Sequence, residues 1–89
     1  MEHRRAEEND WFKGSPKTMN WYLTAHLNGK AIYRYWLGNA WSDPVTTDTY
    51  LPEFEMKPSE MSFIVSQFKV LNLVPDFLTP FTQKASCLL

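Results

Sequence analysis

Apolar and polar side chains alternate along residues 19–41, MNWYLTAHLNGKAIYRYWLGNAW, on both sides of a central Asn28-Gly29. Alternation with a period of two is typical of a strand with one buried face, and an Asn-Gly between two such runs predicts a β-hairpin. Gly29 suits the turn because glycine adopts positive φ without steric cost. Residues 19–41 are therefore expected to form the central hairpin of the domain.

Two hairpin registers are open, and they differ in which side chains share a face. A two-residue turn at Asn28-Gly29 would bring Arg34 to the face that carries Trp21. A three-residue loop over residues 27–29 leaves one face wholly apolar or aromatic, and a half-buried sheet favours that separation. The favoured register pairs Ala25 with Ala31, Leu23 with Tyr33, Trp21 with Tyr35 and Met19 with Leu37.

A second hydrophobic pattern, with helical spacing, begins after Pro58. Pro58 suits the first helical position, and Glu60 complements the positive end of a helix dipole. Pro75 disfavours helical dihedrals at the preceding residue, so the helix is expected to end at Asn72 or Leu73. The expected apolar stripe consists of Met61, Ile64, Val65, Phe68 and Leu71. We expect this stripe to pack on the face of the sheet that carries Trp21.

The other segments read as short or irregular pieces. Gly38-Asn39 predicts a turn that leads to a short third strand at Ala40–Ser42, and Pro52 limits Thr49–Met56 to an edge strand or an extended loop. The fold class is therefore α+β: a small curved antiparallel sheet, made of the hairpin and a short third strand, packed by one C-terminal amphipathic helix. We expect a flexible or helical leader at residues 1–18, one domain at 19–82 and a flexible tail at 83–89, the segment from Pro75 onward wrapping over the core or reaching a partner.

Composition limits the function classes. The chain has 89 residues, 44% of them hydrophobic and 16% aromatic, which is enough for one compact core. No stretch of about 18 apolar residues and no signal-peptide pattern is present, so we expect a soluble cytoplasmic protein that does not enter a membrane. The net charge is −1, but residues 19–41 carry +2 and residues 42–60 carry −4.

The sequence holds no constellation that indicates catalysis. His3 and His26 lack a third ligand at metal spacing, and Cys87 has neither a second cysteine nor a histidine at a diagnostic spacing. Gly14, Gly29 and Gly38 are isolated, so no phosphate-binding loop exists. We therefore expect no enzymatic activity, no metal and no cofactor.

The hairpin supplies the candidate site. It contains three of the four tryptophans and three of the four tyrosines, together with two firm cations and no carboxylate. Aromatic residues and arginine dominate the energetics of protein interfaces. The face opposite the helix is expected to be exposed and to bind a partner through Tyr22, His26, Lys30, Arg34 and Trp36.

Two kinds of partner fit that face. A larger protein, or a second copy of the chain, would use the aromatic residues as anchors. Single-stranded nucleic acid is the alternative, because single-strand binders also combine aromatic platforms with cations, although the pI of about 6.1 gives a weak electrostatic footprint.

The pattern Y-x-Y-W-x-G-x-x-W at residues 33–41, followed by an acidic linker and one expected helix, is similar to that of small accessory proteins of phages and mobile elements. The resemblance covers residues 19–71. It implies an adaptor or an inhibitor that recruits or blocks a larger protein.

Overall fold

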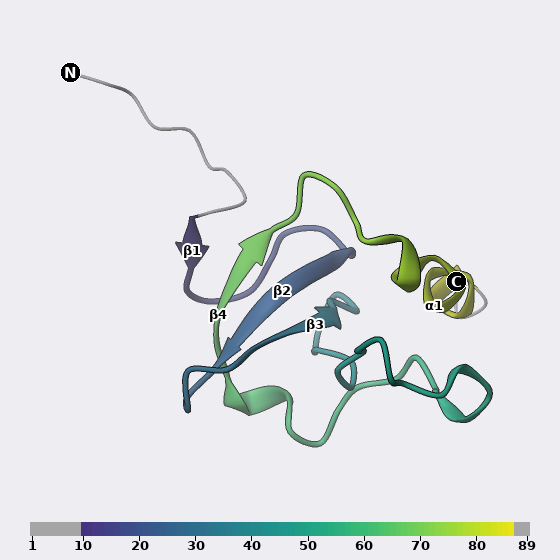
Figure 1. Ribbon diagram of the computed structural model, residues 1–89. Helices are drawn as coiled ribbons and strands as arrows, with labels where there is room; N and C mark the ends of the chain where they lie inside the picture. Colours follow the sequence, from purple (N-terminus) through teal and green to yellow (C-terminus); the bar gives the residue numbers. More distant parts are fainter. Residues whose placement is uncertain (1–9, 87–89) are drawn as a thin grey trace.

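The computed structural model describes residues 10–86, with side chains described for residues 10–84. Four strands form one open antiparallel sheet in the order β1-β4-β2-β3, and helix α1 follows near the C-terminus (Figure 1). The elements are β1 (Trp11–Phe12), β2 (Trp21–His26), β3 (Ala31–Tyr35), the 3-10 helices η1 (Leu51–Glu53) and η2 (Ser62–Ile64), β4 (Val65–Val70), the 3-10 helix η3 (Asp76–Leu78) and α1 (Thr79–Ser86). The predicted α+β class, an antiparallel sheet with one C-terminal helix, is confirmed.

Strands β2 and β3 form the predicted hairpin, in the register of the three-residue loop. Trp21 lies opposite Tyr35. The loop is closed by hydrogen bonds from the Gly29 amide to the His26 carbonyl (2.9 Å) and from the His26 amide to the Lys30 carbonyl (2.8 Å). Gly29 has a φ of 87°, a backbone conformation that is unfavourable for a residue with a side chain. The chemistry of the turn and the separation of the two faces therefore agree on one register.

The helix expected from Pro58 to Leu73 is wrong. The chain forms η2 there and then β4, which pairs with β2 at the centre of the sheet. A β-bulge beside His26 places Val65, rather than Ser66, opposite that residue. Val65 and Phe68 consequently contact the same cluster although they are three positions apart. A bulged strand thus reproduces part of the spacing that predicts a helix.

The expected apolar stripe is also divided among several environments. Phe68 is buried in a cluster with Tyr22, whereas Leu71 packs against the cluster that contains Trp21. Met61 is 51% exposed. The stripe therefore does not cover the Trp21 face as one unit, and α1 and residues 45–56 contribute to that face instead.

The expected third strand at Ala40–Ser42 is reduced to isolated bridges. Trp41 pairs with Trp36, and Ser42 pairs with Pro58. The bridges place this segment along the outer edge of β3, where it protects backbone groups that an edge strand would otherwise expose.

Three other segments remain to be compared with expectation. Residues 49–56 form no strand, which leaves the loop of the two expected alternatives, with η1 inside it. Within the leader expected at residues 1–18, Trp11 and Phe12 form β1 and pair with β4, and residues 1–9 lie outside the described residues. Helix α1 continues to Ser86, past the expected end of the domain.

Side chains pack on both faces of the sheet. The first cluster, on the α1 side, consists of Trp21, Tyr35, Val45, Phe54, Met56, Leu78 and Phe81. The second cluster, on the opposite face, consists of Tyr22, Trp36, Trp41 and Phe68, with Phe12, Val65 and Val70 packed against it.

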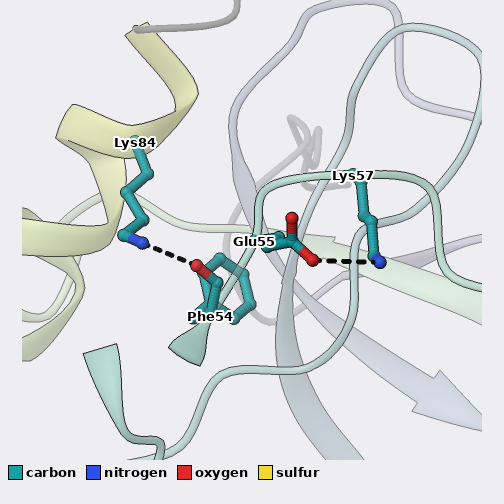
Figure 2. Close-up of polar contacts among 4 residues, drawn as sticks. All are labelled: Phe54, Glu55, Lys57 and Lys84. Carbon is teal, nitrogen blue, oxygen red and sulfur yellow. Dashed lines mark hydrogen bonds and ion pairs between the residues drawn. The ribbon is translucent and has the colours of Figure 1, made fainter. Parts of the chain in front are cut away.

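Helix α1 is fixed to the rest of the domain by apolar and polar contacts. The Phe81 ring meets Phe54 edge to face, with the ring centroids 5.2 Å apart. The Trp21 indole donates a hydrogen bond to the Thr82 hydroxyl (2.8 Å). Figure 2 shows the Lys84 ammonium donating to the Phe54 carbonyl at 2.7 Å. The C-terminal segment therefore wraps over the core, one of the two alternatives expected for the segment from Pro75 onward.

Candidate interaction surface at the end of the hairpin

The predicted contact face is mostly buried. Tyr22 and Trp36 are each 6% exposed, and Arg34 is 2% exposed. The Trp41 ring lies 5.0 Å from Trp36 between centroids, and the Phe68 ring lies 5.3 Å from Tyr22. The expectation that Tyr22, Arg34 and Trp36 stand on an open surface is wrong, because the chain after β3 and strand β4 bring two more aromatic rings onto this face.

Arg34 binds a buried backbone carbonyl and is not available to a partner at the surface. Its Nη1 donates to the Ser42 carbonyl at 2.7 Å, and its Nη2 lies 3.2 Å from His26 Nε2. Its Nε is buried and finds no hydrogen-bond partner in the described part of the chain. Burial lowers the pKa of Arg34, and the negative charge of Asp43 opposes this shift. The guanidinium therefore ties the segment after β3 to the hairpin.

The surroundings of His26 favour its neutral form. Burial, the Arg34 guanidinium and Lys30 lower its pKa below the ordinary value of 6.5. A guanidinium has donors only, so His26 Nε2 must accept the hydrogen bond and the ring proton resides on Nδ1. Protonation of Nε2 would remove this acceptor and set two cations side by side.

The exposed members of the predicted set lie at the end of the hairpin, beside a group of apolar side chains. Lys30 is exposed there, and His26 is half-buried. His26, Leu27, Asn28 and Ile64 line a hollow of about 170 Å³. Leu27 is 78% exposed and Phe63, which precedes Ile64, is 77% exposed. We call Leu27, Phe63 and Ile64 the hairpin-end patch.

The pairing of β2 with β4 explains why the hairpin-end patch forms. His26 of β2 lies opposite Val65 of β4, so the next residues beyond this pair, Leu27 and Ile64, are neighbours. Figure 1 shows the turn between β2 and β3 beside the 3-10 helix that precedes β4. Residues far apart in sequence therefore present apolar side chains at the same end of the sheet.

The segments that supply the hairpin-end patch carry few negative side chains, and the nearest carboxylate in sequence is Glu60, three residues before Phe63. Residues 19–42 and residues 61–71 contain no aspartate and no glutamate. Lys30 is the exposed cation of the hairpin. The surface is therefore apolar with a positive border, and it complements a segment that has an apolar anchor beside a carboxylate.

The nucleic-acid alternative loses the observation that favoured it. Base stacking needs exposed aromatic faces, and Tyr22 and Trp36 are enclosed by other side chains. Arg34 is likewise enclosed. Of the predicted set, only Lys30 and His26 remain at the surface.

Within residues 10–86, no group of three or more His, Cys, Asp or Glu side chains is placed to hold a metal ion. His3 and Cys87 lie outside the described residues. No helix of the described range is long and apolar enough to cross a membrane. In the comparisons with known proteins, no family model, no curated protein and no solved structure matches the chain.

Sequence reasoning missed the three members of the hairpin-end patch. Leu27 carried a signal, because a large apolar residue in a three-residue hairpin loop has no core to enter. Phe63 and Ile64 carried no sequence signal that distinguishes an exposed position from a position in an apolar helical stripe. Their exposure depends on β4 beginning at Val65.

Proposed function

We propose that the protein is a non-enzymatic interaction module that binds a larger protein through the hairpin-end patch, and so recruits or inhibits that protein. The observation that carries the proposal is the exposure of Leu27 and Phe63, at 78% and 77%, at one end of the sheet. Contiguous exposed apolar side chains are typical of interaction sites. The proposed binding surface is therefore the end of the sheet, and not the face of the sheet that was expected from the sequence.

Burial of this patch would supply part of the binding free energy of a complex, and the surrounding interface would supply the rest. Burial of a leucine or a phenylalanine side chain contributes about 1.5–3 kcal/mol each. Anchors of this kind account for most of the binding energy of an interface, while their neighbours exclude water. The hollow beside His26 and Ile64 offers a place for one side chain of the partner.

The partner is expected to present an apolar side chain close to an acidic one. The apolar group would contact Leu27 and Phe63, and the carboxylate would lie near Lys30. A partner cation would meet Lys30 and would find no carboxylate within residues 19–42. This complementarity favours an acidic, apolar protein segment over a basic one.

The experiment uses the full chain as bait in an extract of its source organism, followed by mass spectrometry and by calorimetry with the identified partner. Leu27→Ser and Phe63→Ser are the test variants. Leu73→Ser is the matched control, because Leu73 is 83% exposed and lies outside the patch. Each test variant is expected to weaken binding by roughly 30-fold, as expected for an anchor worth about 2 kcal/mol.

Salt separates the two classes of partner. Binding through apolar anchors should change little between low and moderate salt, whereas phosphate-dependent binding falls steeply. Equal affinities for the Phe63→Ser and Leu73→Ser variants would contradict the assignment of the patch. A complex that survives only at low salt and contains nucleic acid would favour the alternative. Sedimentation of the free protein tests whether a second copy is the partner.

A further inference from the structure

A separate pocket lies on the opposite side of the sheet from α1, under the segment that joins β1 to β2. Residues 13–18 of this segment run past β4 on their way to β2 (Figure 1). Pro16 is buried. Thr18 anchors the end of the segment, because its hydroxyl lies 2.9 Å and its carbonyl 3.0 Å from the Tyr22 hydroxyl.

The pocket has a volume of about 480 Å³. Small-molecule sites range over roughly 300–1,000 Å³, so the space is adequate for a compact ligand. The lining residues are Phe12, Lys13, Ser15, Pro16, Lys17, Thr18, Tyr22, Phe68 and Val70.

The wall of the pocket is aromatic and apolar. The Phe68 ring lies between Phe12, at 5.7 Å between centroids, and Tyr22, at 5.3 Å. The Tyr22 hydroxyl is already engaged by Thr18, so the tyrosine presents its ring to the pocket without an unsatisfied polar group. Such a wall favours a ligand with a hydrocarbon body.

The rim of the pocket is positive. Lys13 and Lys17 are both exposed, and neither forms an ion pair with another described residue. No acidic side chain is among the nine lining residues. Two ammonium groups beside an apolar wall complement a molecule that carries one anionic end on a hydrocarbon body.

We propose that this pocket binds a small amphiphilic monocarboxylate, with its hydrocarbon body against Phe12, Phe68 and Val70 and its carboxylate between Lys13 and Lys17. The proposal goes beyond the interaction at the hairpin-end patch and does not depend on it. The apolar wall sets the affinity for the chain of the ligand. The lysines select the anion over a neutral or cationic molecule with the same chain.

The test is a titration of the full-length protein with decanoate below its micelle concentration, followed by amide and methyl NMR. Decanol and decyltrimethylammonium are the matched ligands, since they carry the same chain with a neutral or a positive end. Decanoate is expected to bind saturably, at least 10-fold more tightly than either. The shifts should centre on Phe12, Val70 and residues 13–18.

The variant Lys13→Glu/Lys17→Glu should weaken decanoate binding by at least 10-fold while the far-ultraviolet circular dichroism stays unchanged. Lys30→Glu/Lys57→Glu makes the same change in net charge away from the pocket and should bind as the parent does. Three results would overturn the proposal. They are equal binding of the three ligands, equal losses in the two double variants, and absence of saturable shifts at the pocket.

Discussion

Replacing Trp36 with alanine tests the most consequential difference between the expected and the observed surface. On an open binding face, this change would leave stability nearly unaltered. In the structure Trp36 is 6% exposed and its ring contacts Trp41 at 5.0 Å between centroids. The side chain is thus part of the second cluster, and its removal should leave a cavity between the sheet and the segment after β3.

The magnitude follows from the area that the indole buries. A buried aromatic side chain removes about 150–250 Å² from water, which at roughly 25 cal/mol per Å² corresponds to about 4–6 kcal/mol. That figure is an upper bound, because the unfolded chain already buries part of its apolar surface. Large-to-small changes at buried aromatic residues give about 3–5 kcal/mol. We therefore expect Trp36→Ala to lower the free energy of unfolding by about 4 kcal/mol.

Urea denaturation followed by circular dichroism measures this change. A domain of ordinary stability has about 5–15 kcal/mol in total, so the alanine variant is expected to be close to unfolding at 37 °C. Trp36→Phe keeps a ring in the site and should remain folded with a smaller loss. Leu73→Ala, at a position that is 83% exposed, is the control and should stay within about 0.5 kcal/mol. A loss below about 1 kcal/mol for Trp36→Ala would refute the burial of this face.

Three further changes test the turn, the histidine and the helix contact. Gly29→Ala should lower stability by about 1 kcal/mol because φ is 87° there, whereas D-alanine introduced by synthesis should not. Folding lowers the His26 pKa below 6.5, so below pH 6.5 the unfolded chain binds more protons than the folded chain. The stability contributed by neutral His26 should therefore be complete above pH 6.5 and should decrease as the pH falls from 6.5 toward the folded-state pKa. His26→Gln should flatten that dependence in melts at pH 5 and 7.5, and an unchanged slope would contradict it. Lys84→Met should lower stability by about 1–3 kcal/mol and speed amide exchange in α1, because its ammonium holds the Phe54 carbonyl. Lys57→Met, which breaks the exposed pair with Glu55 seen in Figure 2, should change stability by less than about 1 kcal/mol, and equal effects of the two lysines would count against the helix contact.

The hairpin could be predicted from sequence because its determinants are local. Gly29 restricts the turn, and the alternation on either side of it permits one register with an apolar face. These features need no knowledge of what packs against the hairpin. The α+β class is also correct, but its helix was expected from Pro58 to Leu73, whereas the structure has β4 there and a helix at Thr79–Ser86.

Strand β4 could not be predicted because its apolar spacing depends on its partner. The bulge beside His26 brings Val65 and Phe68 to the same cluster, and a spacing of three then imitates a helix turn. Helix α1 was not expected either. Its Pro80 lies in the first helical turn, where proline is compatible with a helix.

The candidate site was expected on one open face that carried Tyr22, His26, Lys30, Arg34 and Trp36. In the structure Trp41 and Phe68 cover Tyr22 and Trp36, Arg34 is buried, and Lys30 and the half-buried His26 lie at the end of the hairpin. Composition indicated enough aromatic and apolar residues for one compact core. It did not indicate that aromatic side chains would fill both faces of the sheet.

The position of β4 at the centre of the sheet also determines how the chain reaches its fold. Strands β2 and β3 are joined by a short loop, and such hairpins form within about 1–10 μs. Strand β4 must instead find β2 across residues 27–64, which makes the final pairing non-local and slow. During synthesis the hairpin leaves the ribosome before β4 and α1 exist, so Trp21 and Trp36 stay unprotected until residues 65–81 follow. The newly made chain therefore exposes these aromatic side chains at the stage when its hairpin is already formed and residues 65–81 have not yet been added.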